Sequence, residues 1–133
     1  MTAETSLVSG TDFITVATKD FDAAVEFYGS VLGLPESKRW GQMPGVEFET
    51  GSLTIAVMES AAFGLEFHSN NHPIALHVDD VEAARAELET RGVSFGADTI
   101  DSGVCHMAYF VDPDGNALML HHRYAPPGAR PKD

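Results

Sequence analysis

The feature that most constrains this chain is a short pattern that occurs twice, about sixty residues apart. Residues 20–24, Asp-Phe-Asp-Ala-Ala, return at residues 80–84 as Asp-Val-Glu-Ala-Ala. Each copy follows a short apolar run and leads into a segment of helical spacing that ends at a glycine, Gly33 or Gly92. Repeats of this length usually mean that one supersecondary unit is used twice, so the sequence predicts a duplicated fold.

The first predicted unit begins with a strand over residues 13–18, which are rich in β-branched side chains. Asp20 is expected to cap the following helix, because its carboxylate can accept backbone N–H groups. Gly33 can take the left-handed conformation that ends a helix. Three further strands are expected, at residues 37–40, 45–50 and 53–58.

The second unit is predicted to repeat this order. A strand over residues 74–78 precedes a helix that Asp80 caps and Gly92 ends. Residues 112–116, Asp-Pro-Asp-Gly-Asn, form a predicted turn, because proline presets φ while glycine and asparagine accept positive φ. The remaining strands are expected at residues 94–97, 106–111 and 117–122.

These elements predict an α+β fold of two tandem βαβββ modules, about residues 12–60 and 72–123, in one domain over residues 1–133. One helix covers one face of each curved mixed sheet, and the opposite faces are left to line a cleft, a natural small-molecule site. Outside the modules we expect a loose N-terminal arm over residues 1–10. A proline-rich extended tail is expected over residues 125–133.

Charge and cysteine content exclude several classes of partner. A net charge of −12 with only eight Lys and Arg argues against nucleic acid, because phosphate binding needs a basic patch. The acidic balance favours either a cationic ligand or simple solubility. The single cysteine, Cys105, can form no disulfide within the chain and fits a reducing compartment. With no signal-peptide pattern and no membrane-spanning apolar run, a cytoplasmic protein without a membrane partner is expected.

The chain resembles the vicinal-oxygen-chelate superfamily, which includes glyoxalases, bleomycin-resistance proteins and extradiol dioxygenases. The resemblance rests on residues 16–28, on Val-Leu-Gly-Leu at 31–34 and on residues 109–118, which contain the Asp-Pro-Asp-Gly-Asn turn. It covers about residues 12–123 and is specific in the combination of these segments. It implies two βαβββ modules, mixed sheets and a homodimer.

Enzymes of that superfamily typically bind one divalent metal through His or Glu on the cleft face of the first and last strand of each module. The resemblance places these positions at Phe13, Ala56, Pro73 and Met119. None of these side chains can ligate a divalent metal, which needs imidazole, thiolate or carboxylate donors. We therefore expect no metal and no cofactor, and a cleft with an apolar floor that binds a small molecule.

Two histidines on the expected cleft face leave a choice open. By alternation, His77 shares its face with Pro73 and His121 shares its face with Met119, and the strands that carry them are neighbours in the superfamily. The pair could be a displaced metal site or a weak catalytic acid–base candidate, since imidazole does both. The favoured alternative is two polar side chains at the rim of the cleft, because no carboxylate at matching spacing completes a set of metal ligands.

Trp40 is the candidate for stacking on a ligand, with a dimer contact or an edge lid as the alternatives. Glu47 and Glu49 alternate with apolar residues and are expected either to form a solvated face or to give the cleft a negative rim.

Three functions remain open at this point. The first is a metal-free binding protein, similar to the bleomycin-resistance branch, that sequesters an aromatic or cationic ligand. The second is a lyase, isomerase or dioxygenase whose metal ligands, with His77 and His121 as the candidates, stand in an unusual register. The third is a metal-independent enzyme that uses one of these histidines as a general base.

Overall fold

The computed structural model describes residues 6–126. The expected tail therefore lies outside the described residues apart from residues 125 and 126, as do the first five residues of the arm. Residues 6–12 are exposed and contain no helix or strand. The first module contains β1 (Phe13–Thr18), α1 (Phe21–Glu26), a π-helical segment (Phe27–Val31), β2 (Glu36–Arg39), β3 (Gly45–Glu49), β4 (Thr54–Glu59) and a 3₁₀ turn (Ser60–Phe63). The second contains β5 (Ile74–His77), α2 (Val81–Thr90), β6 (Ile100–Asp101), β7 (Cys105–Val111) and β8 (Ala117–Arg123).

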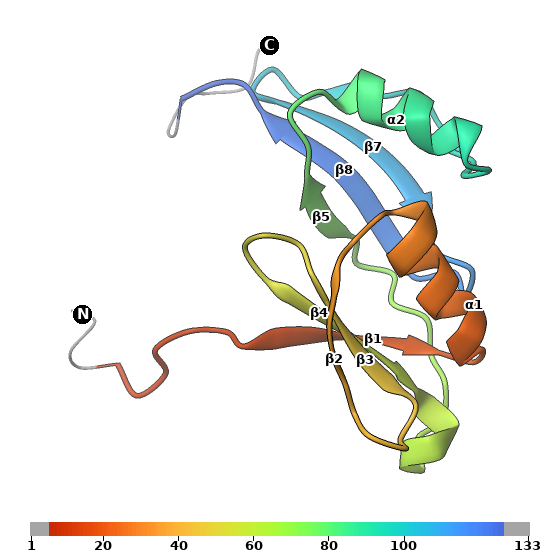
Figure 1. The fold of residues 1–133 in the computed structure, drawn as a ribbon. Helices are drawn as coiled ribbons and strands as arrows, with labels where there is room; N and C mark the ends of the chain where they lie inside the picture. The colour runs from red at the N-terminus through yellow and green to blue at the C-terminus, as the bar shows by residue number, and fades with distance from the viewer. Residues whose placement is uncertain (1–5, 127–133) are drawn as a thin grey trace.

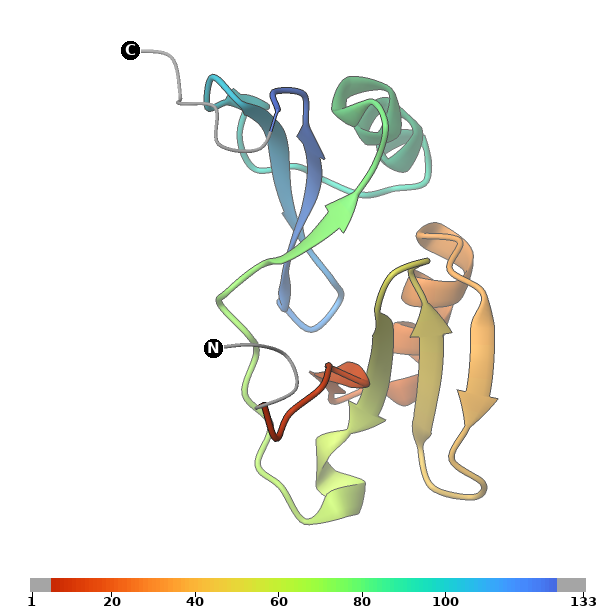
Figure 2. The ribbon, with the colours of Figure 1, turned by 90° about the vertical axis from the view of Figure 1, so that its left-hand side faces the viewer.

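Two four-stranded mixed sheets confirm the predicted fold class. Their strand orders, β1-β4-β3-β2 and β5-β8-β7-β6, are the same order of elements used twice. In each sheet the first and last strands of the module pair in parallel, and the other pairs are antiparallel. Figure 1 shows the modules one above the other, with α1 and α2 on the same side. Figure 2 shows the segment between β4 and β5 running from one module to the other.

The repeated aspartates cap both helices, as predicted. The Asp20 carboxylate accepts the Ala23 N–H at 3.2 Å, and the Asp80 carboxylate accepts the Ala83 N–H at 3.0 Å. Both aspartates have extended backbones, which is the usual conformation of an N-cap residue. The duplication therefore extends from the sequence to the local hydrogen bonding.

One predicted strand was wrong. No strand covers residues 94–97; the second sheet instead ends in the two-residue strand β6. The Val93 N–H donates to the Leu88 carbonyl at 3.0 Å, so the chain is still tied to the end of α2 there. The ring of Phe95 packs against Phe110 and lies under the guanidinium of Arg85. Contacts of the side chain with the core therefore hold this segment, although its backbone pairs with no strand.

A single hydrophobic core lies on the helix-facing sides of both sheets. Tyr28 stacks on Phe48 of the first module, while its neighbour Phe27 reaches Phe110 of the second. The core residues come from both modules: Val16, Ala24, Phe27, Tyr28, Val46, Phe48, Ile55, Val57, Val81, Leu88, Ala108, Phe110, Leu118 and Leu120. The modules thus share one core, and the other face of each sheet contributes nothing to it.

The Asp-Pro-Asp-Gly-Asn turn joins the modules through buried and partly buried hydrogen bonds. Asp112 accepts the Tyr28 hydroxyl at 2.8 Å, and Asn116 donates its side-chain N–H to the Ala17 carbonyl at 2.8 Å. Thr18 donates its hydroxyl to the Asp114 carboxylate. Burial, and then the charge of Asp112, raise the pKa of Tyr28 far above its usual range. The motif that supports the resemblance is therefore the link between the two copies of the repeat.

Among residues 6–126, no helix is long and apolar enough to cross a membrane.

Candidate functional site

The faces of the two sheets that point away from the helices carry the predicted site residues. We call these faces the open face of sheet 1, formed by Phe13, Thr15, Gly45, Glu47, Glu49, Ala56 and Met58, and the open face of sheet 2, formed by Ala75, His77, Met107, Tyr109, Val111, Met119 and His121. Exposure alternates with the strand period, so that Val16 is 4% exposed and Phe13 is 45% exposed. Tyr109 and Val111 are likewise exposed on sheet 2.

Strand register shows that the carried-over positions are equivalent in the two modules. Thr15 pairs with Ala56 in the first module, and Ala75 pairs with Met119 in the second. Phe13 stands two residues before Thr15 in the same strand, and Pro73 stands two residues before Ala75. Phe13 and Ala56 therefore lie on the open face of sheet 1, with Ala56 completely covered by its neighbours. Met119 lies on the open face of sheet 2, and Pro73 leads into it.

Trp40 lies at the end of the open face of sheet 1, directly after β2. Its indole packs on Gly45, where an added Cβ would stand only 2.2 Å from the ring. Phe63 meets the indole edge-on at 5.9 Å between ring centroids, and the indole N–H donates to the Glu47 carboxylate at 2.7 Å. These three contacts hold Trp40 half-buried in one orientation.

The two glutamates of β3 are held by hydrogen bonds on the same face. Glu49 accepts the hydroxyls of Ser37 and Thr54, at 2.5 and 2.7 Å. These two hydrogen bonds lower the pKa of Glu49, so its carboxylate is ionised at neutral pH. Glu47 is bound to the Trp40 indole. The open face of sheet 1 thus combines one fixed aromatic side chain with two fixed carboxylates. Glu47 and Glu49 are held by side-chain hydrogen bonds, which a freely solvated acidic face would not require.

On sheet 2, His77 and His121 are direct partners across the parallel β5–β8 pair, which confirms that they are neighbours. The His77 Nε2 lies 3.2 Å from the Asp79 carboxylate, and both side chains are mostly exposed. The His77 ring also lies 5.8 Å from that of His122. His122, which the sequence analysis did not select, has a buried Nδ1 with no hydrogen-bond partner.

The donors present do not fit the divalent metal that the resemblance implies. Phe13, Ala56, Pro73 and Met119 offer no imidazole or carboxylate at the expected positions. Within residues 6–126, no three His, Cys, Asp or Glu side chains form a group that could hold a metal ion.

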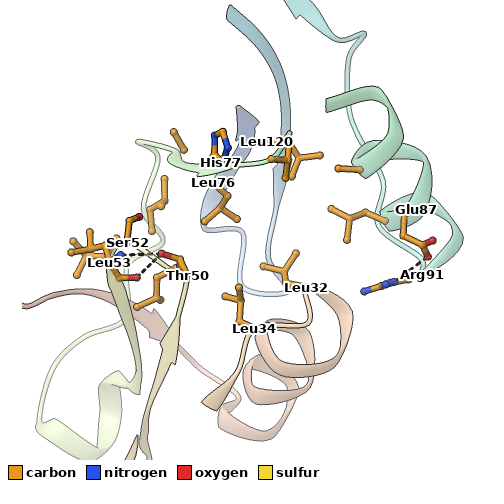
Figure 3. A pocket seen from close by; sticks show the side chains of 17 residues that line it. Leu32, Leu34, Thr50, Ser52, Leu53, Leu76, His77, Glu87, Arg91 and Leu120 are labelled. Carbon is orange, nitrogen blue, oxygen red and sulfur yellow. Dashed lines mark hydrogen bonds and ion pairs between the residues drawn. The ribbon is translucent and has the colours of Figure 1, made fainter. Parts of the chain in front are cut away.

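A cavity of about 430 Å³ lies between the modules, lined mostly by helix-facing residues and, at β5, also by Ala75 and His77 of the open face of sheet 2. Of the predicted ligand-binding residues, His77 lines it and the other six do not. Its walls come from β1, the turn between β3 and β4, β5 and α2, as Figure 3 shows. The period of a strand or helix predicts which face of its element a side chain lies on. It does not predict that a cavity remains where the two modules meet.

Comparisons with known proteins agree on the fold. The sequence model of the glyoxalase/bleomycin resistance protein/dioxygenase superfamily matches residues 10–120. A lactoylglutathione lyase from Schizosaccharomyces pombe is 28% identical over 79% of this chain, which spans only 44% of that protein's length.

Solved structures show the same architecture. A glyoxalase/bleomycin resistance protein/dioxygenase from Nocardioides has a TM-score of 0.72 at 22% identity, covering 98% of this chain and 93% of its own. A lactoylglutathione lyase from Agrobacterium tumefaciens has a TM-score of 0.69 at 19% identity, covering 87% of this chain and 95% of its own. At these identities the two structures establish similarity of fold alone.

Proposed function

Because this chain belongs to the glyoxalase/bleomycin resistance protein/dioxygenase superfamily, we propose that it is a metal-free small-molecule binding protein. It captures an aromatic, cationic ligand on its open sheet faces, in the manner of the bleomycin-resistance branch that its sequence resembles. The observation that carries the proposal is the chemistry of the four positions where the superfamily's enzymes hold their metal. Phe13, Pro73 and Met119 offer apolar surface there, Ala56 is covered by its neighbours, and none of the four is a metal donor.

The open face of sheet 1 supports the aromatic, cationic character of the ligand. A planar cation can stack on or beside the Trp40 indole, which is the aromatic side chain best suited to cation–π contact. The carboxylates of Glu47 and Glu49 lie on the same face and need no reorganisation, since hydrogen bonds already hold them. The net charge of −12 raises the local concentration of a cation further.

A thermal-shift screen against aromatic cationic antibiotics, bleomycin included, followed by calorimetric titration of the hits, tests the proposal. For a hit, Trp40→Ala and Glu47→Gln should each weaken binding by about tenfold, the loss of one cation–π contact or one fixed charge. Glu66→Gln makes the same charge change on an exposed side chain and should leave affinity unchanged. Absence of stabilisation by every compound, in folded protein, would overturn the proposal.

A metal-dependent lyase is the second candidate, favoured by the similarity to a lactoylglutathione lyase and by the pairing of His77 with His121. Elemental analysis after incubation with nickel, zinc, iron and manganese separates the two. One metal per chain that is lost in His77→Ala or His121→Ala, together with lactoylglutathione lyase activity, would establish the enzyme. That result would also remove the metal-free proposal.

A further inference from the structure

The cavity between the modules lies mainly on the helix-facing side of both sheets, against residues such as Ile14, Leu76 and Leu120. It meets the open face of sheet 2 at β5, where Ala75 and His77 also line it. Its volume of about 430 Å³ falls within the range of small-molecule pockets. We infer that this cavity is a second binding site, for a neutral and mostly apolar small molecule.

Four leucines around the cavity are left half-buried. Leu32 and Leu34 follow the π-helical segment, Leu53 lies in the turn before β4, and Leu76 lies in β5. Figure 3 shows Leu32 and Leu34 pointing toward Leu76 from the opposite module, with the cavity between them. Interiors are normally close-packed, and a void deprives its lining atoms of contacts. An apolar molecule here would bury leucine surface that the chain's own fold leaves uncovered.

The charges at the cavity indicate that its ligand is neutral. Arg91 donates its Nε–H to Glu87 at 3.2 Å and an Nη1–H to the Val31 carbonyl at 2.8 Å. These two ionised side chains therefore already neutralise one another. A charged ligand among the leucines would lose its hydration without gaining a partner, which is costly. The hydroxyl of Ser52, at the turn, can serve one polar group of a neutral ligand.

A matched pair of fluorescent probes tests size and charge together. N-phenyl-1-naphthylamine is neutral, and 8-anilinonaphthalene-1-sulfonate is the same skeleton with one added sulfonate. We expect the neutral probe to bind one per chain with enhanced fluorescence, and the sulfonate to bind at least about tenfold more weakly. Equal affinities, or no saturable binding of the neutral probe, would overturn the inference.

Leu34→Trp places a larger side chain in the cavity and should weaken the neutral probe by about tenfold or more. Leu65→Trp makes the same change at an exposed leucine that does not line the cavity, and should leave probe affinity within about twofold of the parent. If Leu34→Trp does not fold by circular dichroism, Ser52→Trp, at an exposed lining position, replaces it. Unchanged affinity in the folded variant would refute the site.

Two further readouts separate this site from its alternatives. Trp40→Ala should leave probe affinity unchanged, because Trp40 does not line the cavity; a loss would mean that the probe sits on the open face. Sedimentation velocity over the titrated range reports self-association. Probe affinity that falls as the chain associates would show that a second copy fills the cavity, which would overturn the small-molecule assignment.

Discussion

Removal of one hydroxyl group, Tyr28→Phe, tests how the two modules are held together. The Tyr28 hydroxyl and the Asp112 carboxylate are 0% and 3% exposed by residue, and the first donates to the second at 2.8 Å. Asp112 also accepts the Asn116 side-chain N–H at 2.8 Å and the backbone N–H groups of Asp114 and Asn116 at 2.9 Å each. The substitution therefore removes one of four donors and leaves the ring in the core.

The expected cost follows from the charge of the acceptor. A hydrogen bond to an ionised group contributes about 1.5–3 kcal/mol, and the three remaining donors still stabilise Asp112, so we expect a loss of about 2 kcal/mol. Asp112→Asn should cost more, about 3–4 kcal/mol, because an amide group turns a donor toward other donors at a buried site. When Asp112→Asn is already present, Tyr28→Phe should cost at least about 1 kcal/mol less than it does in the parent protein. This difference is the coupling energy between the two side chains, which come from different modules.

The change of stability at alkaline pH is an independent test of the same side chain. Burial raises the pKa of Tyr28 in the folded state, so the proton is released first from the unfolded chain. Its contribution is fully present below the unfolded value of about 10 and declines as the pH rises beyond it, by up to about 1.4 kcal/mol per pH unit. Above that pH, the stability of Tyr28→Phe should decline less steeply than that of the parent.

Urea unfolding at pH 7 and at about pH 10.5, followed by Trp40 fluorescence and by circular dichroism, measures these quantities. Tyr109→Phe is the matched control, since Tyr109 is 38% exposed and its hydroxyl donates to the Met107 sulfur, a weak acceptor, at 3.7 Å; it should change stability by less than about 0.5 kcal/mol. A Tyr28→Phe loss as small as the control's would refute the reasoning. Separate unfolding transitions for the two modules in the parent would do the same.

Three further outcomes are expected. Asp20→Ala and Asp80→Ala should each cost about 1 kcal/mol in urea unfolding, because each removes an equivalent N-cap; a cost confined to one would show that the caps are not equivalent. Gly45→Ala should displace the Trp40 indole, which an added methyl would overlap, and shift its fluorescence to the red; an unshifted spectrum would mean that Trp40 does not pack there. Two hydroxyl donors lower the pKa of Glu49 below its ordinary value of 4.5, so its contribution is present above that pH and is lost as the pH falls through the lower folded value. Glu49→Gln should therefore flatten the fall in stability as the pH drops below about 5, and an unchanged slope would contradict the assignment.

Much of the fold could be predicted because it depends on short-range chemistry. Asp20 and Asp80 cap helices through groups three residues away. Gly33 and Gly92 end them with φ of 75° and 92°. Strand alternation assigned His77 and His121 to the cleft face, and the resemblance made their strands neighbours, as the pairing of β5 with β8 confirms. The caps and helix ends needed only neighbouring residues, whereas the histidine pair needed the resemblance as well.

What escaped prediction depends on distant parts of the chain. A strand was expected at residues 94–97, yet Phe95 packs on Phe110 and the backbone pairs only later, at β6. The cavity near Leu34 and Leu76 exists because two modules meet with a space between them. The packing of the Trp40 indole against Gly45, which holds this stacking candidate in one orientation, depends on the turn between β2 and β3.

The two copies of the repeat show where this chain's function must be sought. Equivalent core positions stay apolar, as with Phe48 and Phe110, because both copies must fill the same shared interior. Equivalent open-face positions differ in chemistry: β3 carries Glu47 where β7 carries Tyr109. No packing requirement in the described residues explains that divergence, since the open faces contribute nothing to the core. We therefore expect the side chains of the open faces to determine which ligand this protein binds, and similarity of fold does not predict those side chains. Glu47→Gln is for this reason a sharper test of function than any core substitution.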